Sequence, residues 1–269
     1  MKIIKSINKL NKEVNFKANV GFVPTMGALH NGHLSLIKSS MKKCKKTIVS
    51  IFVNPSQFNS INDYKKYPKN ISRDINILEK RKIDYLFIPN KGDIYKNKKN
   101  MKIKINYKDK ILCAKYRKGH FEGVLGVINQ FLKIVKAKYM FLGEKDYQQV
   151  YLIKKFIKNK YKIKIIPGKT LRDKNLLAYS SRNFLLKNHE LQKASRIAKK
   201  IKYFHNLIKK KFNNLNKLKD IEKDISKEGV KIEYFEVRNK NNLSKKINKL
   251  NFKIFIAYYI NKIRLIDNF

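Results

Sequence analysis

Residues Val23 to Leu34 read VPTMGALHNGHL, and this stretch indicates how the chain begins to fold. The apolar run VGFVP, residues 20–24, has the length and composition of a buried strand. A turn containing Gly27 follows, and then a helical pattern. The segment therefore predicts a strand, a turn and a helix, with His30 and His33 at the helix N-terminus. Unpaired backbone N–H groups and the helix dipole favour anions at that position.

Strand-like and helix-like stretches continue to alternate as far as about residue 166. Short apolar runs typical of buried strands are TIVSIFVN (47–54), DYLFIP (84–89), YMFLG (139–143) and IKIIP (163–167). Apolar residues at helical spacing occur between them, in residues 32–44, 72–82, 122–136 and 146–160. This alternation predicts an α/β domain with a mainly parallel sheet covered by helices. The ligand crevice of such a sheet lies beyond the carboxyl ends of its strands.

After about Arg172 the pattern changes. Helical spacing over residues 188–212 and 216–229 precedes three strand-like runs, KIEYFEVRN, FKIFIAYYI and IRLIDNF. We expect a smaller α+β domain there, which gives domains of residues 1–173 and 174–269. The Lys/Asn-rich segments around residues 96–110 and 238–251 are expected to be surface loops.

The formal net charge of +45 has two interpretations. Clustered basic residues would indicate a nucleic-acid surface, because they release counterions from phosphates. The lysines are instead spread from Lys2 to Lys262 together with abundant Asn and Ile, which favours a bias of composition.

Cys44 and Cys113 have no metal-binding spacing and are expected to be reduced thiols. With no apolar run long enough for a signal peptide or a membrane span, the chain is expected to be soluble and cytoplasmic.

The histidine pair itself leaves three interpretations open. Two imidazoles at a helix N-terminus can donate hydrogen bonds to phosphate oxygens and stabilise the charge that grows as an α-phosphate is attacked. A metal pair would need a third ligand, and none stands nearby in the sequence. Incidental surface histidines are the third possibility.

The spacing resembles the HxGH signature of the nucleotidylyl-transferase superfamily, whose members attack the α-phosphate of a nucleotide and expel pyrophosphate. Six segments in order, VPTMGALHNGH, SIFVNPSQF, KYPKNISRD, YRKGHFEGV, FLGEKDYQQ and YSSRN, together resemble the pantothenate synthetase family. The resemblance runs from Phe22 to Asn183 and reappears in RLIDN near the C-terminus. It implies a Rossmann-like parallel-sheet domain, a smaller α+β domain that covers the active site, and a homodimer formed through the larger domain.

The resemblance also implies a two-step ligation. Pantoate attacks the α-phosphate of ATP to give pantoyl adenylate and pyrophosphate, and the amine of β-alanine then displaces AMP. His33, His30 and Lys145 are the implied catalytic residues. The implied ATP-binding set is Met26, Gly27, Ala28, Leu29, His30, Asn31, Gly32, His33, Gly143, Glu144, Lys145, Asp146, Leu171, Tyr179, Ser180, Ser181 and Arg182.

Four further residues match family positions that hold pantoate or β-alanine, namely Gln57, Gln149, Tyr67 and Arg117. Asp74 matches a position that helps to place Mg²⁺, which is expected chiefly on the ATP phosphates because it prefers oxygen ligands and keeps several waters. His120 is expected to be structural.

The sequence departs from the family pattern in three places. Lys118 replaces a proline, Tyr179 replaces a smaller apolar residue, and a glycine is missing near Asn175. The first and third changes put the stiffness of a loop and the shape of a hairpin in doubt.

Two rival functions have sequence features that test them. A cytidylyltransferase or an aminoacyl-tRNA synthetase shares the histidine signature, but the chain has no KMSKS motif, no room for an anticodon-binding domain, and both pantoate-matching glutamines. A nucleic-acid-binding module would show a continuous basic stripe with interleaved aromatic residues. No specific nucleic-acid partner and no membrane partner are expected.

Overall fold

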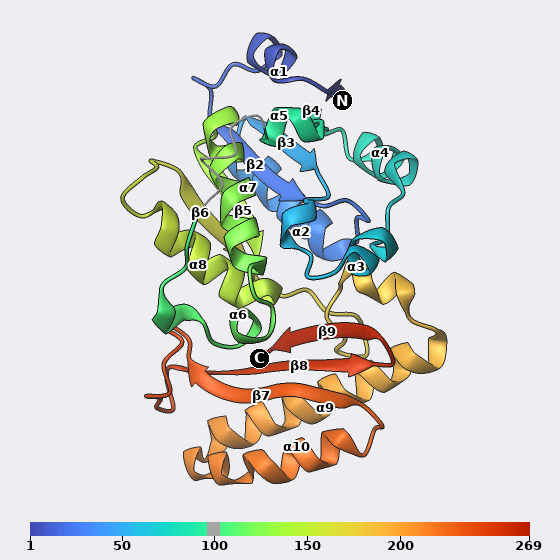
Figure 1. Ribbon diagram of the computed structural model, residues 1–269, viewed down its shortest axis with the longest axis vertical. Helices are drawn as coiled ribbons and strands as arrows, with labels where there is room; N and C mark the ends of the chain where they lie inside the picture. The colour runs from blue at the N-terminus through green and yellow to red at the C-terminus, as the bar shows by residue number, and fades with distance from the viewer. Residues whose placement is uncertain (96–102) are drawn as a thin grey trace. The chain divides into compact units, whose positions relative to one another are not determined.

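The computed structural model describes residues 1–95 and 103–269, which form two compact units, Met1–Lys169 and Thr170–Phe269 (Figure 1). Part of the Lys/Asn-rich segment around residues 96–110, namely residues 96–102, lies outside the described residues. The domain boundary after residue 173 and the covering of the active site by the smaller domain stay predictions.

The larger unit is built on a parallel sheet of six strands in the order β1-β4-β3-β2-β5-β6. The strands are β1 (Lys2–Ile4), β2 (Val20–Thr25), β3 (Lys46–Ile51), β4 (Tyr85–Phe87), β5 (Tyr139–Gly143) and β6 (Lys164–Gly168). The helices are α1 (Ile7–Glu13), α2 (Asn31–Lys43), α3 (Ile61–Lys66), α4 (Ile71–Lys80), α5 (Lys91–Tyr95), α6 (Cys113–Tyr116), α7 (His120–Ile134) and α8 (Tyr147–Ile157). Short 3₁₀ turns are η1 (Pro55–Gln57), η3 (Tyr107–Asp109) and η4 (Glu144–Asp146).

Successive side chains of a strand point to opposite faces of the sheet, and both faces of this sheet are buried. On one face, Val23 and Val49 pack in a cluster with Ile37 of α2 and Leu78 of α4. On the other face, Phe22 and Phe87 pack against Phe131 of α7, with ring centroids 5.4 and 6.4 Å apart. Burial on both sides explains why these strands read as continuous apolar runs in the sequence.

The strand order changes direction between β2 and β5. From β2 the chain proceeds through β3 to β4 on one side, whereas β5 and β6 lie on the other. Such a switch point opens a crevice at the carboxyl ends of the two neighbouring strands. The turn that carries His30 follows β2, and η4 follows β5. The topology therefore brings the two segments to the same place at the sheet edge.

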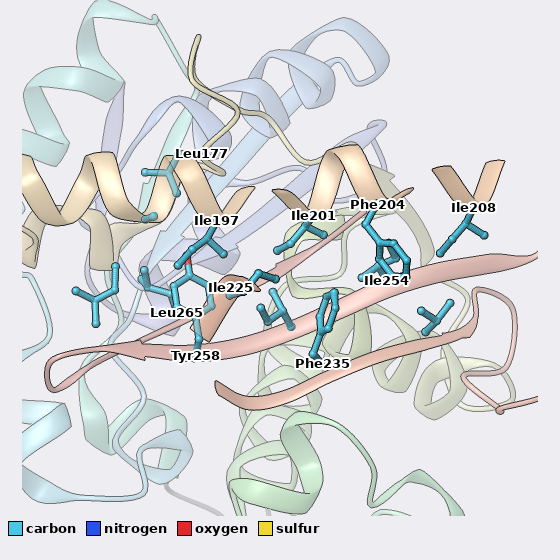
Figure 2. Packing of buried hydrophobic residues seen from close by; sticks show 14 of the residues in the cluster. Leu177, Ile197, Ile201, Phe204, Ile208, Ile225, Phe235, Ile254, Tyr258 and Leu265 are labelled. Carbon is cyan, nitrogen blue, oxygen red and sulfur yellow. The ribbon is translucent and has the colours of Figure 1, made fainter. Parts of the chain in front are cut away.

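The smaller unit pairs two helices with an antiparallel sheet. Its strands β7 (Lys231–Asn239), β8 (Phe252–Ile260) and β9 (Ile263–Asn268) form a meander, and its helices are α9 (Asn188–Lys210) and α10 (Leu218–Ser226), with the turns η5 (Ser181–Leu185) and η6 (Phe212–Lys217). Figure 2 shows the core of this unit, in which Ile197, Ile201 and Phe204 of α9 pack against Phe235 and Ile254 of the sheet.

The predicted fold class is confirmed, since the chain has a parallel α/β sheet and a smaller α+β part. The prediction missed β1, a three-residue strand that pairs in parallel with β4 at the edge of the sheet. In the two described ranges, no helix combines the length and apolar character that a bilayer span requires.

Candidate active site

The backbone at the start of α2 fixes the orientation of His30. His30 is the N-cap residue of this helix, and the backbone N–H of Gly32 donates to its Nδ1 over 3.1 Å. Because Nδ1 accepts this hydrogen bond, the proton of the neutral ring is on Nε2. His30 can therefore donate a hydrogen bond from Nε2 while α2 itself holds the other nitrogen.

His33 lies one turn further along α2, and its ring centroid is 4.0 Å from that of His30. Burial lowers the pKa of His30 from 6.5 to about 2, helped by His33 and by the positive charges of Lys145 and Arg73. Burial lowers the pKa of His33 to about 4, with a smaller lowering by Lys145 and an opposing effect of Asp146. Both rings are thus neutral near pH 7. They offer N–H donors, and the positive charge beside them comes from Lys145.

Lys145 and Asp146 belong to η4, which directly follows β5. Lys145 Nζ lies 3.7 Å from Asp146 Oδ1, and the lysine side chain is only 19% exposed. Since Lys145 acts electrostatically on both histidines, these three predicted catalytic residues lie within one region of the larger unit. A half-buried ammonium beside neutral imidazoles suits a phosphate chain.

Gln57 is held close to the predicted nucleotide turn. Its side chain is buried, its Oε1 accepts a hydrogen bond from Asn54 Nδ2 over 3.2 Å, and its Nε2 faces Met26 Sδ. The structure therefore brings one predicted pantoate residue next to one predicted ATP residue, Met26.

Arg117 and His120 hold the backbone of Gln57. The Gln57 carbonyl accepts hydrogen bonds from His120 Nδ1 at 2.6 Å and from Arg117 Nη2 at 3.2 Å. Arg117 Nε also donates to Asn59 Oδ1, and Asn59 Nδ2 donates to the carbonyl of Lys118. The loop in which Lys118 replaces a proline is thus tied by side-chain hydrogen bonds. The structure gives Arg117 a role in supporting Gln57, while its contact with pantoate stays a prediction.

The two adjacent glutamines of α8 differ in their surroundings. Gln148 is buried, and its amide is engaged by the backbone of Asp109, Ile111 and Ala114. Gln149 is half-buried on the next position of the helix. Gln148 therefore has a structural role. Gln149 remains the residue of this pair that is predicted to bind pantoate.

Tyr67 ends α3 and packs its ring edge-on against Phe58, with centroids 5.5 Å apart.

Asp74 of α4 is 1% exposed, and its two carboxylate oxygens accept hydrogen bonds from the backbone N–H groups of Ala28 and Leu29. This environment favours an anchoring role for Asp74 over the predicted role as a metal ligand. Among residues 1–95 and 103–269, no group of three or more His, Cys, Asp or Glu side chains is arranged to hold a metal ion.

Of the other predicted ATP residues, Asn31, Gly143 and Glu144 belong to α2, β5 and η4 of the larger unit, and those from Leu171 onward lie in the smaller unit. The hydroxyl of Ser180 accepts a hydrogen bond from the backbone N–H of Arg182 at the start of η5, and Ser181 is buried. Arg182 Nη1 donates to the carbonyl of Arg264 in β9. Tyr179 N–H donates to the carbonyl of Leu171, whose side chain is exposed.

A hairpin leads into this segment, and the missing glycine falls in it. Leu176 has a φ of +69°, in the left-handed region that favours glycine. Asp173 Oδ1 accepts from the backbone N–H groups of Asn175 and Leu177. Arg172 donates to the carbonyl of Leu176 and forms a two-pronged ion pair with Asp267 at 2.7 and 2.8 Å. The hairpin is therefore held by side chains where the sequence lacks a glycine.

Known proteins resemble this chain along its whole length. The family model described as pantoate-beta-alanine ligase matches residues 2–269. The chain belongs to this family. A pantothenate synthetase of Francisella tularensis subsp. novicida is 42% identical over 268 residues, which cover 99% of this chain and 95% of that protein. One of Francisella philomiragia subsp. philomiragia is 40% identical over 270 residues, covering 100% and 95%.

Solved structures of the family share the fold along the whole chain. A pantoate-beta-alanine ligase from Francisella tularensis, complexed with beta-gamma ATP and beta-alanine, has a TM-score of 0.85 and 38% identity, and the match covers 100% of this chain and 97% of that one. A pantothenate synthetase from Thermus thermophilus has a TM-score of 0.91 and 26% identity, with coverage of 100% and 99%. The predicted family, enzyme class and ligase activity are confirmed.

The sequence did not predict the partners of two residues of this region. Asp74, which was expected to help place Mg²⁺, accepts hydrogen bonds from the backbone of Ala28 and Leu29, and His120, which was expected to be structural, holds the carbonyl of Gln57. No spacing in the sequence predicts these contacts, since they join residues more than 40 positions apart.

Proposed function

We propose that the chain makes pantothenate from pantoate and β-alanine through a pantoyl-adenylate intermediate formed at His30, His33 and Lys145. The observation that carries this proposal is a pair of neutral imidazoles at the N-terminus of α2, beside the Lys145 ammonium at the switch point of the sheet. The proposal is supported by the chemistry of this arrangement, because N–H donors and one positive charge at the switch point of a parallel sheet suit a nucleotide phosphate chain.

In the first step, a pantoate carboxylate oxygen forms a bond to the α-phosphorus of ATP, and the bond from that phosphorus to the β-phosphate bridging oxygen breaks. Negative charge grows on the α-phosphate oxygens and on the departing pyrophosphate. His30, which has its ring proton on Nε2, donates to this charge together with His33, and Lys145 neutralises part of it. Because the rings are neutral before ATP binds, each stabilises this charge as a hydrogen-bond donor and not as an imidazolium cation.

In the second step, the amine of β-alanine attacks the carbonyl carbon of pantoyl adenylate. The bond between that carbon and the bridging oxygen breaks, AMP leaves with the electron pair, and the new amide loses a proton. Gln57 and Gln149 are proposed to hold the hydroxyl and carboxylate groups of pantoate, since amides both donate and accept hydrogen bonds. Ser180, Ser181 and Arg182 are proposed to bind the pyrophosphate.

Mg²⁺ is proposed to enter on the ATP phosphates, where it would offset their charge. Asp74 does not fit an ion that replaces its backbone partners, so no step is assigned to a protein-bound metal. A homodimer formed through the larger unit, a cytoplasmic location and the covering of the site by the smaller unit stay predictions.

The test separates the two half-reactions. With ATP and pantoate alone, the enzyme should release one pyrophosphate per site in a burst, and AMP should appear only after β-alanine is added. Turnover with CTP, or with an amino acid in place of pantoate, would contradict the proposal.

The His33→Ala variant should slow the burst by about 100- to 1000-fold with a smaller change in ATP affinity, because its hydrogen bond strengthens in the transition state. His189→Ala, at an exposed position of α9, is the matched control and should leave the burst unchanged.

A further inference from the structure

The turn between β2 and α2 is anchored from a helix far away in the sequence. Ala28 N–H donates to Asp74 Oδ2 and Leu29 N–H donates to Asp74 Oδ1, both over 2.8 Å. Asp74 lies in the first turn of α4, and its side chain is 1% exposed. One buried carboxylate therefore binds two successive N–H groups immediately before His30.

This turn has a backbone conformation that needs support. Gly27 and Ala28 both have positive φ, at +78° and +49°. The left-handed region is open to glycine but costs free energy for alanine. A Cβ added to Gly27 would come within 2.9 Å of Asp74 Oδ2, so the carboxylate packs closely against the glycine. Asp74 thus fits the turn by both hydrogen bonding and shape.

Neighbouring groups complete the anchor. Thr25 Oγ1 accepts a hydrogen bond from the N–H of Gly27 and donates to the carbonyl of Ser50 in β3. Arg73, next to Asp74 on α4, donates from Nη1 to the carbonyl of Leu29 over 3.2 Å. The N–H and the C=O of Leu29 are both bound by α4. The position of the turn, and with it the start of α2, is therefore held by α4 together with Thr25.

The same contacts disfavour a metal at this carboxylate. Both oxygens of Asp74 already accept hydrogen bonds, and Arg73 Nη1 lies 4.0 Å from Oδ1. A divalent cation here would have to compete with two backbone donors and stand beside a guanidinium. Mg²⁺ usually keeps several of its water ligands when it binds to a protein. The Asp74 side chain is only 1% exposed and leaves no room for such a hydrated ion.

We propose that Asp74 is a positioning residue for adenylation, which holds the Gly27–Leu29 turn so that His30 and His33 face the α-phosphate, and that it does not ligate the magnesium of ATP. The inference rests on the proposed roles of His30 and His33. It assigns to α4 the task of fixing the geometry of the histidine pair.

The test compares Asp74→Asn with Asp74→Ala. Asparagine keeps the shape and one acceptor oxygen, whereas alanine removes both acceptors. Glu79→Gln, at an exposed position of the same helix, is the matched control for loss of a carboxylate. For each variant the single-turnover pyrophosphate burst, the ATP affinity and the magnesium concentration for half-maximal rate are measured.

The adenylation rate should fall in the order wild type, Asp74→Asn, Asp74→Ala, with a loss of about 100-fold for alanine, because small misplacement of reacting groups is costly. The magnesium dependence should stay that of the wild type. A rate that excess magnesium restores, or a full adenylation rate in both variants, overturns the inference. His33→Ala reports separately on the proposed function, since it removes the imidazole and leaves the Asp74 contacts intact.

If the variants do not fold, the unaltered enzyme still provides a test. Ala28 and Leu29 precede α2 and lie outside any strand, and their N–H groups donate to Asp74. Held by this carboxylate, they should exchange with deuterium at least about 100-fold more slowly than unstructured amides. Exchange at the unstructured rate contradicts the inference.

Discussion

The protonation state of the histidine pair is set chiefly by burial. Gly32 N–H occupies Nδ1 of His30, and Lys145 and Arg73 oppose a further positive charge on the ring. An imidazole near its ordinary pKa of 6.5 would be partly charged in the cell. Here burial keeps both rings neutral, and the hydrogen bond from Gly32 fixes the tautomer of His30.

We therefore predict that the ring nitrogens of His30 and His33 do not titrate between pH 8 and about pH 5, the interval in which an ordinary imidazole titrates. The folded rings resist protonation until about pH 2 and about pH 4, while the unfolded rings take up protons near 6.5. The stability they contribute is therefore complete above pH 6.5, and it falls as the pH drops toward about 4 for His33 and toward about 2 for His30. Ring nitrogen shifts measured by NMR check this, and a midpoint near 6.5 for either ring would contradict it.

His120 has a single tautomer compatible with its partners. The Gln57 carbonyl can only accept, so Nδ1 of His120 carries the proton, and Arg117 Nη1 at 3.0 Å from Nε2 can only donate, so Nε2 is unprotonated. The His120 ring thus links the guanidinium of Arg117 to the backbone carbonyl of Gln57 by two hydrogen bonds.

We expect His120→Ala to raise the KM for pantoate by about tenfold, because the loss of a buried hydrogen-bond partner costs about 1–3 kcal/mol. His120→Asn, which can still donate to the Gln57 carbonyl, should lose less. The KM for ATP should stay unchanged in both. Steady-state kinetics with each substrate varied in turn provides the check, and an equal rise in both KM values would count against this role.

At the level of elements, the hairpin before η5 contains a leucine where a glycine would be relaxed. A non-glycine residue in the left-handed region costs about 1–2 kcal/mol, whereas glycine costs about 0.5–1 kcal/mol through the entropy of the unfolded chain. Arg172 and Asp173 hold the turn in this conformation. The side chain of Leu176 is half-buried, and that of Leu177 is buried.

Leu176→Gly should therefore change the free energy of unfolding by less than about 1 kcal/mol, although it deletes a whole side chain. The neighbouring Leu177→Ala, which empties a buried position, should cost about 2–5 kcal/mol. Denaturant unfolding of the full chain measures both. The backbone strain of a leucine in the left-handed region is about 1–2 kcal/mol. A loss of more than about 2 kcal/mol for Leu176→Gly would therefore show that this strain is absent from the hairpin.

The sequence predicted most of these elements because their patterns are strong. The inner strands are continuous apolar runs, and α9 keeps its apolar spacing over residues 188–210. It did not predict β1, whose three residues stand among lysines and become a strand only by pairing with β4. The motif residues were found by resemblance. The partners of Asp74 and His120 were not predicted, because they are backbone groups that the fold brings near from distant parts of the sequence.

At the scale of the whole molecule, the net charge of +45 is the feature that the site does not explain. The active-site region uses a few residues, and the remaining lysines are spread along the chain. A charge of this kind attracts polyanions without selecting among them.

Binding to duplex DNA, single-stranded DNA and an unrelated polyanion should therefore weaken steeply and equally as salt is raised, since the screening length falls from about 30 Å at 0.01 M to about 10 Å at 0.1 M. Titrations at several salt concentrations provide the measurement. A complex that selects one nucleic acid at physiological salt would instead indicate a dedicated binding surface.

The central claim is that a pantoate carboxylate oxygen attacks the α-phosphate of ATP at the His30, His33 and Lys145 site. The most direct test uses pantoate labelled with ¹⁸O in both carboxylate oxygens, with ATP and β-alanine, and mass spectrometry of the nucleotide product. The account predicts AMP that carries one ¹⁸O, because the bridging oxygen of pantoyl adenylate leaves with AMP. AMP without ¹⁸O, or ADP as the nucleotide product, would contradict it.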